Sequence, residues 1–111
     1  MTDVYIWGTK NLAIPASTTV DIRNATYWAS PLPASWPSKP FNELIVLNAS
    51  AQSIDLVLDA DPFKVWTIPA NGGSLEIDKE DKIFFLFFQI TNLSNAISIA
   101  ASTITATLRR V

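Results

Sequence analysis

Acidic side chains gather at two places in this 111-residue chain, Asp59 with Asp61 and then Asp78 with Glu80 and Asp81. Clustered carboxylates are the usual ligands of Ca²⁺, and two carboxylates set across a cleft can hydrolyse glycosidic bonds. Neither group has the glycine-turned spacing of a dedicated calcium loop, and no spacing in the sequence fixes a distance across a cleft. The charged run 78–82 is more typical of a solvated turn than of a ligand site. We therefore predict no metal site, no catalytic residues and no cofactor.

Cysteine and histidine are both absent from the chain. It therefore has no side chain whose ordinary pKa lies near neutrality and no imidazole or thiolate ligand for a metal. The common Ser/His and Cys/His nucleophile pairs are excluded for the same reason. The sequence predicts that this protein is not an enzyme.

Aromatic residues and prolines are concentrated in the segment 27–41. Prolines hold such a segment extended, and tryptophan and phenylalanine are residue types that anchor binding surfaces. We predict an arm that packs on a neighbouring subunit. Two alternatives stay open, because the segment could instead cover one end of its own domain, or its tryptophans could be exposed and stack on sugar rings. The predicted interface residues are Trp28, Pro31, Leu32, Pro33, Trp36, Pro37 and Phe41.

The elements that must position these residues are repeated along the chain. Ile14-Pro15-Ala16 precedes an alternating apolar stretch, and Ile68-Pro69-Ala70 does so again. A second signature, Asn48-Ala49-Ser50, returns in the same order as Asn92-Leu93-Ser94. We interpret residues 1–111 as a single domain of two similar halves, at about 4–58 and 63–108, with a Pro-rich insert at about 29–41.

Alternation of apolar and polar residues predicts strands, most clearly at 104–108 and 54–58. Residues 83–90 are apolar without alternation, so we expect a central strand with both faces covered, either inside the domain or at a subunit contact. The Ile-Pro-Ala signatures are expected to end a strand and turn the chain at the rim of a sheet. The Asn-x-Ser signatures are expected to be turns within a strand pair. The predicted fold is all-β, a sandwich or a jelly-roll-like barrel of about eight to nine strands.

The composition is poor in charge. Charged residues make up 16 % of the chain, against about 25 % in an average soluble domain. Because a small domain cannot hide all its apolar area, we expect part of the surface to be covered by other copies in a homo-oligomer. The net charge of −2 leaves nucleic acid no basic track to follow. We also expect no secretory signal and no membrane span, because the longest apolar run is far shorter than the ~20 residues a membrane helix needs.

The two Ile-Pro-Ala turns, the alternating stretches Val20-Asp21-Ile22 and Leu75-Glu76-Ile77, and the Asn-x-Ser signatures give the chain a family likeness. It resembles small β-sandwich virion proteins of the capsid-decoration or fibre-base type. The resemblance implies a capsid-associated homo-oligomer, commonly a trimer, that contacts other virion proteins, is made in the host cytoplasm and performs no catalysis. The residues also leave open an alternative to a structural assembly subunit, namely a carbohydrate-binding module with exposed tryptophans.

Overall fold

A computed structural model describes residues 3–9, 13–24, 26–28 and 40–110. These residues form eight strands and one short 3₁₀ helix: β1 (Asp3–Gly8), β2 (Thr19–Asp21), β3 (Glu43–Asn48), β4 (Ile54–Leu58), β5 (Val65–Ile68), β6 (Gly73–Ile77), η1 (Lys79–Asp81), β7 (Phe88–Asn92) and β8 (Ile104–Arg110).

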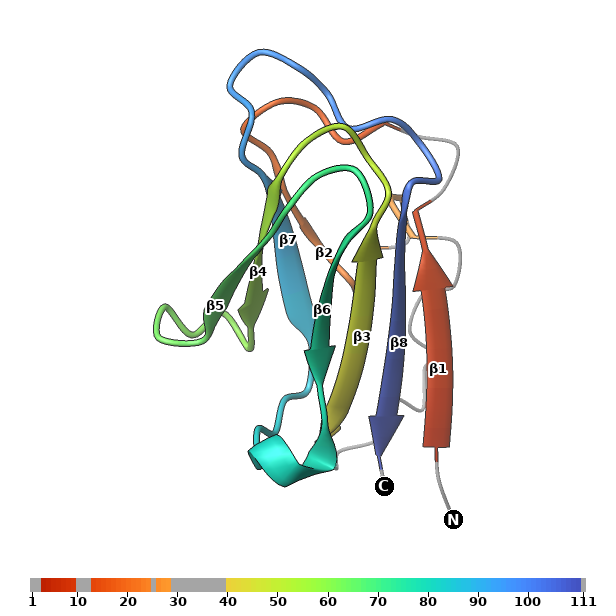
Figure 1. Cartoon of the computed structure of the whole chain (residues 1–111), viewed down its shortest axis with the longest axis vertical. Helices are drawn as coiled ribbons and strands as arrows, with labels where there is room; N and C mark the ends of the chain where they lie inside the picture. The colour runs from red at the N-terminus through yellow and green to blue at the C-terminus, as the bar shows by residue number, and fades with distance from the viewer. Residues whose placement is uncertain (1–2, 10–12, 25, 29–39, 111) are drawn as a thin grey trace.

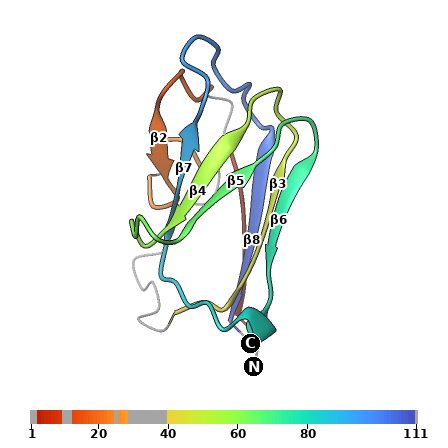
Figure 2. The same ribbon diagram turned by 60° about the vertical axis from the view of Figure 1, so that its left-hand side comes forward.

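The strands make two four-stranded antiparallel sheets that face one another (Figures 1 and 2). Their orders are β1-β8-β3-β6 and β2-β7-β4-β5. The first strand thus pairs with the eighth, the second with the seventh, the third with the sixth and the fourth with the fifth. This is the strand order of a jelly roll, in which one long antiparallel ribbon folds over on itself. The all-β prediction is confirmed.

The core is built from the inward side of each strand. In β8 the buried residues alternate with threonines, as the sequence predicts, and in β4 they alternate with Asp55 and Val57. Alternation arises because successive side chains of a strand point to opposite faces. The two sheets therefore enclose one apolar layer, whose members include Ile54, Leu56, Leu58, Ile104, Ala106 and Leu108.

The two Asn-x-Ser signatures lie at the ends of β3 and β7, and each asparagine side chain is buried. The Nδ2 group of Asn48 donates to the carbonyl oxygens of Gln52 (2.7 Å) and Pro69 (3.1 Å). The Nδ2 group of Asn92 donates to those of Ile97 (2.9 Å) and Pro15 (3.2 Å). Each asparagine thus binds its own turn and the Ile-Pro turn of the other half of the chain.

The main chain around the two asparagines repeats the same arrangement. The amide N–H of Ser50 donates to Asn48 Oδ1 at 3.0 Å, and that of Ser94 donates to Asn92 Oδ1 at 3.0 Å. Across the contact, Asn71 N–H donates to the oxygen of Ser50 (2.7 Å), and Ser17 N–H donates to that of Ser94 (2.8 Å). Ser17 and Asn71 both have positive φ, 55° and 59°. The two signatures therefore hold corresponding positions, while the exact bounds of the two halves remain a prediction.

The signatures differ from the prediction in what they connect. For the Asn-x-Ser signatures we expected turns within strand pairs, but β3 and β4 belong to different sheets, as do β7 and β8. The physical reason is that the side chain of Asn48 or Asn92 takes up the main-chain carbonyls of the turn. This lets the chain leave one sheet and enter the other without exposing unpaired polar groups. The signatures are corners of the sandwich.

The apolar run 83–90 is also shorter as a strand than expected. Only Phe88 onward belongs to β7, and the side chains of Phe84 and Leu86 are exposed by 52 % and 40 %. Pairing with β4 ends where Leu58 meets Phe88, because Asp59 then begins a turn with positive φ. The prediction of an eight-residue strand covered on both faces within the domain is wrong.

Replacing a corner asparagine tests its role in holding the fold. Asn48→Ala or Asn92→Ala leaves several buried main-chain groups without a partner, so we expect a loss of about 2 to 3 kcal/mol in the free energy of unfolding. Asn95→Ala, at an exposed asparagine directly after the second corner signature, should change it by less than about 0.5 kcal/mol. Urea denaturation followed by circular dichroism measures all three. Equal effects at Asn48 and Asn95 would contradict the role assigned to the corners.

Candidate functional site

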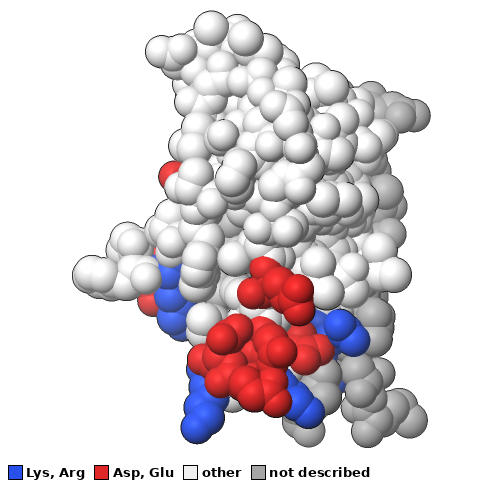
Figure 3. Space-filling view, viewed as in Figure 1, with Lys and Arg blue, Asp and Glu red and all other residues white. Residues whose placement is uncertain are grey.

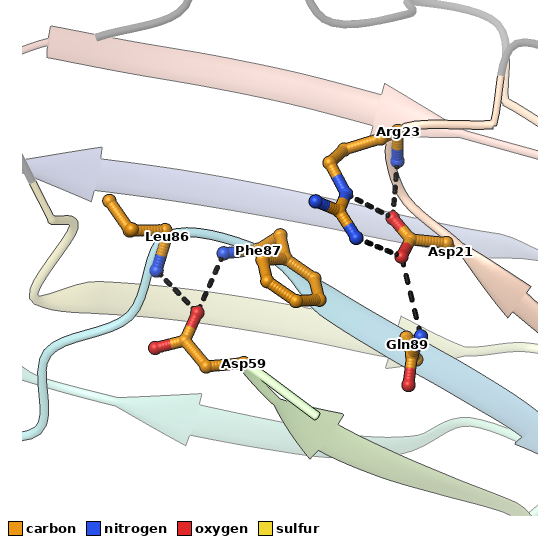
Figure 4. A network of polar contacts seen from close by, with 6 residues as sticks. All are labelled: Asp21, Arg23, Asp59, Leu86, Phe87 and Gln89. Atoms are coloured by element: carbon orange, nitrogen blue, oxygen red, sulfur yellow. Dashed lines mark hydrogen bonds and ion pairs between the residues drawn. The ribbon is translucent and has the colours of Figure 1, made fainter. Parts of the chain in front are cut away.

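A polar network lies on the outward face of the β2-β7-β4-β5 sheet (Figure 4). Asp21 and Gln89 are opposite one another in the β2–β7 register, and Gln89 Nε2 donates to Asp21 Oδ2 at 3.3 Å. Arg23 donates to both carboxylate oxygens of Asp21, from Nε at 2.9 Å and from the terminal nitrogen at 2.7 Å. Its guanidinium also lies 3.7 Å from the ring centroid of Phe87, a cation–π contact.

Asp59 forms the other part of this network and joins two loops. Its Oδ1 accepts from the main-chain N–H of Leu86 at 2.7 Å and of Phe87 at 3.1 Å (Figure 4). Asp59 and Ala60 have φ of 52° and 55°, and Asp61 N–H donates to the oxygen of Leu58 at 2.9 Å. The two positive φ values and this hydrogen bond are those of a type I′ turn, and a second turn at 61–64 completes the connection to β5. The carboxylate fastens the β4–β5 turn to the segment that leads into β7.

The carboxylate of Asp21 is not suited to proton transfer near neutral pH. Partial burial opposes ionisation of Asp21, but the hydrogen bonds and positive charge of Arg23 outweigh burial, so the pKa of Asp21 lies below its ordinary value of 3.8. A general base near neutral pH needs a raised pKa and a free oxygen. The arrangement is an anchor for the sheet and its loops, and it has the chemistry of a structural ion pair.

The acidic run 78–82 has local structure of its own. Asp78 Oδ1 accepts from the N–H of Glu80 at 2.8 Å, and the N–H of Asp78 donates to Asp81 Oδ2 at 2.9 Å. This reciprocal capping box starts η1. Among the described residues, no group of three His, Cys, Asp or Glu side chains is placed to hold a metal ion. In the view of Figure 3, most of the acidic side chains lie near one end of the molecule. Most of the remaining surface in that view is uncharged.

The predicted interface residues divide into two groups. Trp28 and Phe41 have no exposed surface: Trp28 packs edge-on against Phe88 with ring centroids 5.7 Å apart, and Phe41 exchanges two main-chain hydrogen bonds with Phe85. For these two side chains the interface prediction is corrected, because the domain's own core takes up their apolar surface. Pro31, Leu32, Pro33, Trp36 and Pro37 lie outside the described residues.

The correction also bears on sugar binding, which needs an exposed aromatic face. Trp7 and Trp28 are buried, and Trp66 is only half exposed. Trp36 lies outside the described residues. None of the described tryptophans therefore offers an open ring for a sugar to stack on.

The exposed apolar side chains lie elsewhere, and the sequence reasoning did not single them out. One group is the apolar face, which we define as the outward residues Ile6, Ile45, Leu47, Thr105 and Thr107 of the β1-β8-β3-β6 sheet. In this register Thr107 lies between Ile6 and Ile45, and Leu47 lies opposite Thr105. Ile6 and Leu47 are exposed by 66 % and 43 %. The unbroken apolar run 44–47 was a usable signal, because a strand that is apolar on both sides has both faces covered.

Charge is confined to the margins of the apolar face. The ion pair between Arg109 Nε and Glu43 Oε1, 3.2 Å apart, lies at one end of it. Glu76 lies opposite Ile45 on β6, the outermost strand of the sheet. An apolar centre with a charged rim is the composition of a protein–protein contact surface.

Other exposed apolar residues lie in loops. Phe63, in the turn between β4 and β5, is 95 % exposed, and Leu93 and Ile97 lie between β7 and β8. No helix in the described part of the chain is long and apolar enough to cross a membrane. Comparison with known proteins finds no family model, no curated protein and no solved structure that significantly matches this chain.

The pairing of Asp21 with Arg23 predicts a defined acid dependence. A pKa lowered on folding adds stability above the ordinary value, 3.8, and that stability is lost as the pH falls through the folded value. Asp21→Asn should lower the free energy of unfolding by less than about 1 kcal/mol at pH 7, because Arg23 is half exposed. The difference in Tm between wild type and variant should shrink below about pH 4.

Thermal melts from pH 7 to pH 2 make the comparison, and Glu76→Gln controls for the loss of one negative charge on the other sheet. A wild-type-to-variant difference that stays constant over this range would show that the Asp21 ion pair does not stabilise the fold.

Proposed function

We propose that this chain is a non-enzymatic structural subunit that assembles into homo-oligomers. In the form that the family likeness implies, the oligomer is a trimer and forms part of a virion, in contact with other virion proteins. The jelly-roll order is used by viral capsid domains, although it is also used by lectins and by enzymes. The argument therefore rests on surfaces and not on the fold.

The apolar face is the observation that carries the proposal. It is a regular patch on a four-stranded sheet, so its side chains are held in place by the ladder and by the core beneath. Isolated exposed apolar residues are ordinary, but here Ile6, Ile45 and Leu47 share one face with uncharged threonines, and charge lies only at its rim, which is the composition of a contact surface. A second copy offers the same uncharged centre, so contact between copies over this face brings no like charges together there.

The chemistry of the described residues supports an assembly role over catalysis. The best-formed polar cluster is used internally: Asp21 is paired with Arg23, and Asp59 binds two main-chain amides. Hydrogen bonds of this kind hold loops and strands in fixed positions. Fixed loops suit a building block whose contacts must recur identically in every copy.

The proposal predicts a particle larger than one chain of 12.2 kDa in size-exclusion chromatography with light scattering. The double variant Ile6→Glu/Leu47→Glu should lower that mass, because burying two carboxylates in an apolar contact is strongly unfavourable. The control is Leu93→Glu/Ile97→Glu, which adds the same charge at exposed apolar residues of the β7–β8 connection and should leave the mass unchanged.

Two outcomes would count against the proposal. A wild-type protein that stays at the mass of one chain up to about millimolar concentration would refute assembly. An oligomer that both double variants leave intact would refute the apolar face as its contact surface.

A further inference from the structure

The geometry points to the edge of β5, Val65–Ile68, as a twofold contact in which a second copy of the chain adds its own β5 to the sheet. This inference rests on the proposed function and deepens it, because it names a second self-contact of the chain and its register. Since the contact is twofold, it joins two of the oligomers and is not the contact that closes a threefold ring. Edge strands with unpaired main-chain groups are natural templates for pairing with another chain.

The direction of the main-chain groups of β5 follows from the ladder. β5 is the last strand of its sheet and pairs only with β4. Leu58 N–H donates to the oxygen of Lys64, and Asp59 N–H donates to that of Phe87 on the opposite side of β4. Because alternate residues of a strand direct their main-chain groups to the same side, Trp66 and Ile68 bond to β4 as Lys64 does. Val65 and Thr67 direct their N–H and C=O groups outward.

A twofold axis through Trp66 satisfies these outward groups. It places Val65 of one copy opposite Thr67 of the other, which is a hydrogen-bonded antiparallel pair, and the same pair recurs on the other side of the axis. Trp66 of the two copies then meets in the non-hydrogen-bonded position between them. Each of the four outward N–H and C=O groups of one copy thereby finds a partner on the other.

The side chains are compatible with this register. Val65-Trp66-Thr67-Ile68 carries no charge, and Lys64 falls opposite Ile68, so no like charges face each other directly. β5 also turns away from β6 toward its N-terminal end in both views, which leaves that end of the edge open (Figures 1 and 2). Two of the other described edges are less suited, because β6 carries Glu76 and β2 is only three residues long.

Phe63 supplies apolar surface at the end of the same contact. The register places it beside Pro69 of the second copy, which is itself exposed. The turn that presents Phe63 is well defined, because its N–H donates to Asp61 Oδ1 at 2.9 Å and Lys64 N–H donates to the oxygen of Asp61 at 2.9 Å. Because the main chain of the turn is already fixed, binding has to order only the Phe63 side chain, which has two rotatable bonds. The contact accounts for a phenylalanine that the domain leaves 95 % exposed.

Single-cysteine variants test the contact and its register together, because the chain has no cysteine of its own. Two Trp66→Cys copies would have Cα atoms about 4.5 Å apart, the spacing of a non-hydrogen-bonded pair and within reach of a disulfide. In Val65→Cys or Thr67→Cys the two Cα atoms would be about 8 Å apart, which is too far. Mild oxidation followed by non-reducing electrophoresis should give a covalent dimer for Trp66→Cys and at least tenfold less for the other two.

A second measurement does not depend on replacing Trp66. The apolar-face variant Ile6→Glu/Leu47→Glu keeps β5, so it should remain a dimer with twice the chain mass of 12.2 kDa. Adding Thr67→Lys should reduce it to one chain, because lysine on an edge strand opposes pairing. Thr19→Lys is the matched control: Thr19 lies on the opposite edge of the same sheet, and each threonine bonds one neighbouring side chain, Thr67 to Asp55 and Thr19 to Thr91.

Failure of this inference is distinguishable from failure of the proposed function. If the wild-type protein is a monomer, both the proposed function and the β5 contact are refuted. The β5 contact alone is refuted if the wild type is oligomeric but the folded Trp66→Cys variant does not cross-link, or cross-links no faster than Val65→Cys. An equal response to Thr67→Lys and Thr19→Lys also refutes that contact alone, whether or not the cysteine variant folds.

Discussion

The structure depends on two buried asparagine side chains that hold its corners. A jelly roll must pass its chain repeatedly from one sheet to the other, and at each passage main-chain carbonyls leave the ladder. Asn48 and Asn92 supply donors at two of these places, and each also binds the Ile-Pro turn of the opposite half. Because the two sets of bonds are reciprocal, neither half can leave its position without breaking the corner of the other.

Because polar groups are used inside the domain, fewer of them are available on its surface. Asp21, Arg23 and Asp59 are engaged within the domain as well, in bonds that join strands to loops. Few charges are present in the chain, and the centre of the outward side of β1-β8-β3-β6 and the edge of β5 carry none. A rigid frame with uncharged surfaces is suited to repeated contacts with identical copies, and the assembly proposal follows from that distribution.

Much of this frame can be predicted from the sequence because it rests on local patterns. Alternation at 54–58 and 104–108 predicts half-buried strands, and the repeated Asn-x-Ser signature marks two equivalent turns. What the signatures connect was not predictable, because a corner and a hairpin use the same residues and differ only in which distant turn lies beside them. The length of β7 was missed for a similar reason, since its end is set by the partner strand β4 and by the turn at Asp59.

The candidate surfaces were harder to predict than the frame. Tryptophan and phenylalanine at 28 and 41 have the composition of a binding arm, but whether such rings face a partner or the core depends on the space between the sheets, and here the core takes them. Phe63 has no distinctive pattern, because a single aromatic residue in a turn is uninformative without its exposure. Ile6 and Leu47 could be identified only once the strand register showed which side faces outward.

The most direct test of the asparagine corners is hydrogen exchange of asparagine side-chain amides, followed by NMR in the native protein. The account predicts that the Nδ2 protons of Asn48 and Asn92 exchange only when the whole domain unfolds, whereas those of the exposed Asn24 and Asn95 exchange at the rates of free amides. Fast exchange at Asn48 or Asn92 in the folded protein would show that the corners open locally, and would contradict the claim that they hold the two halves together.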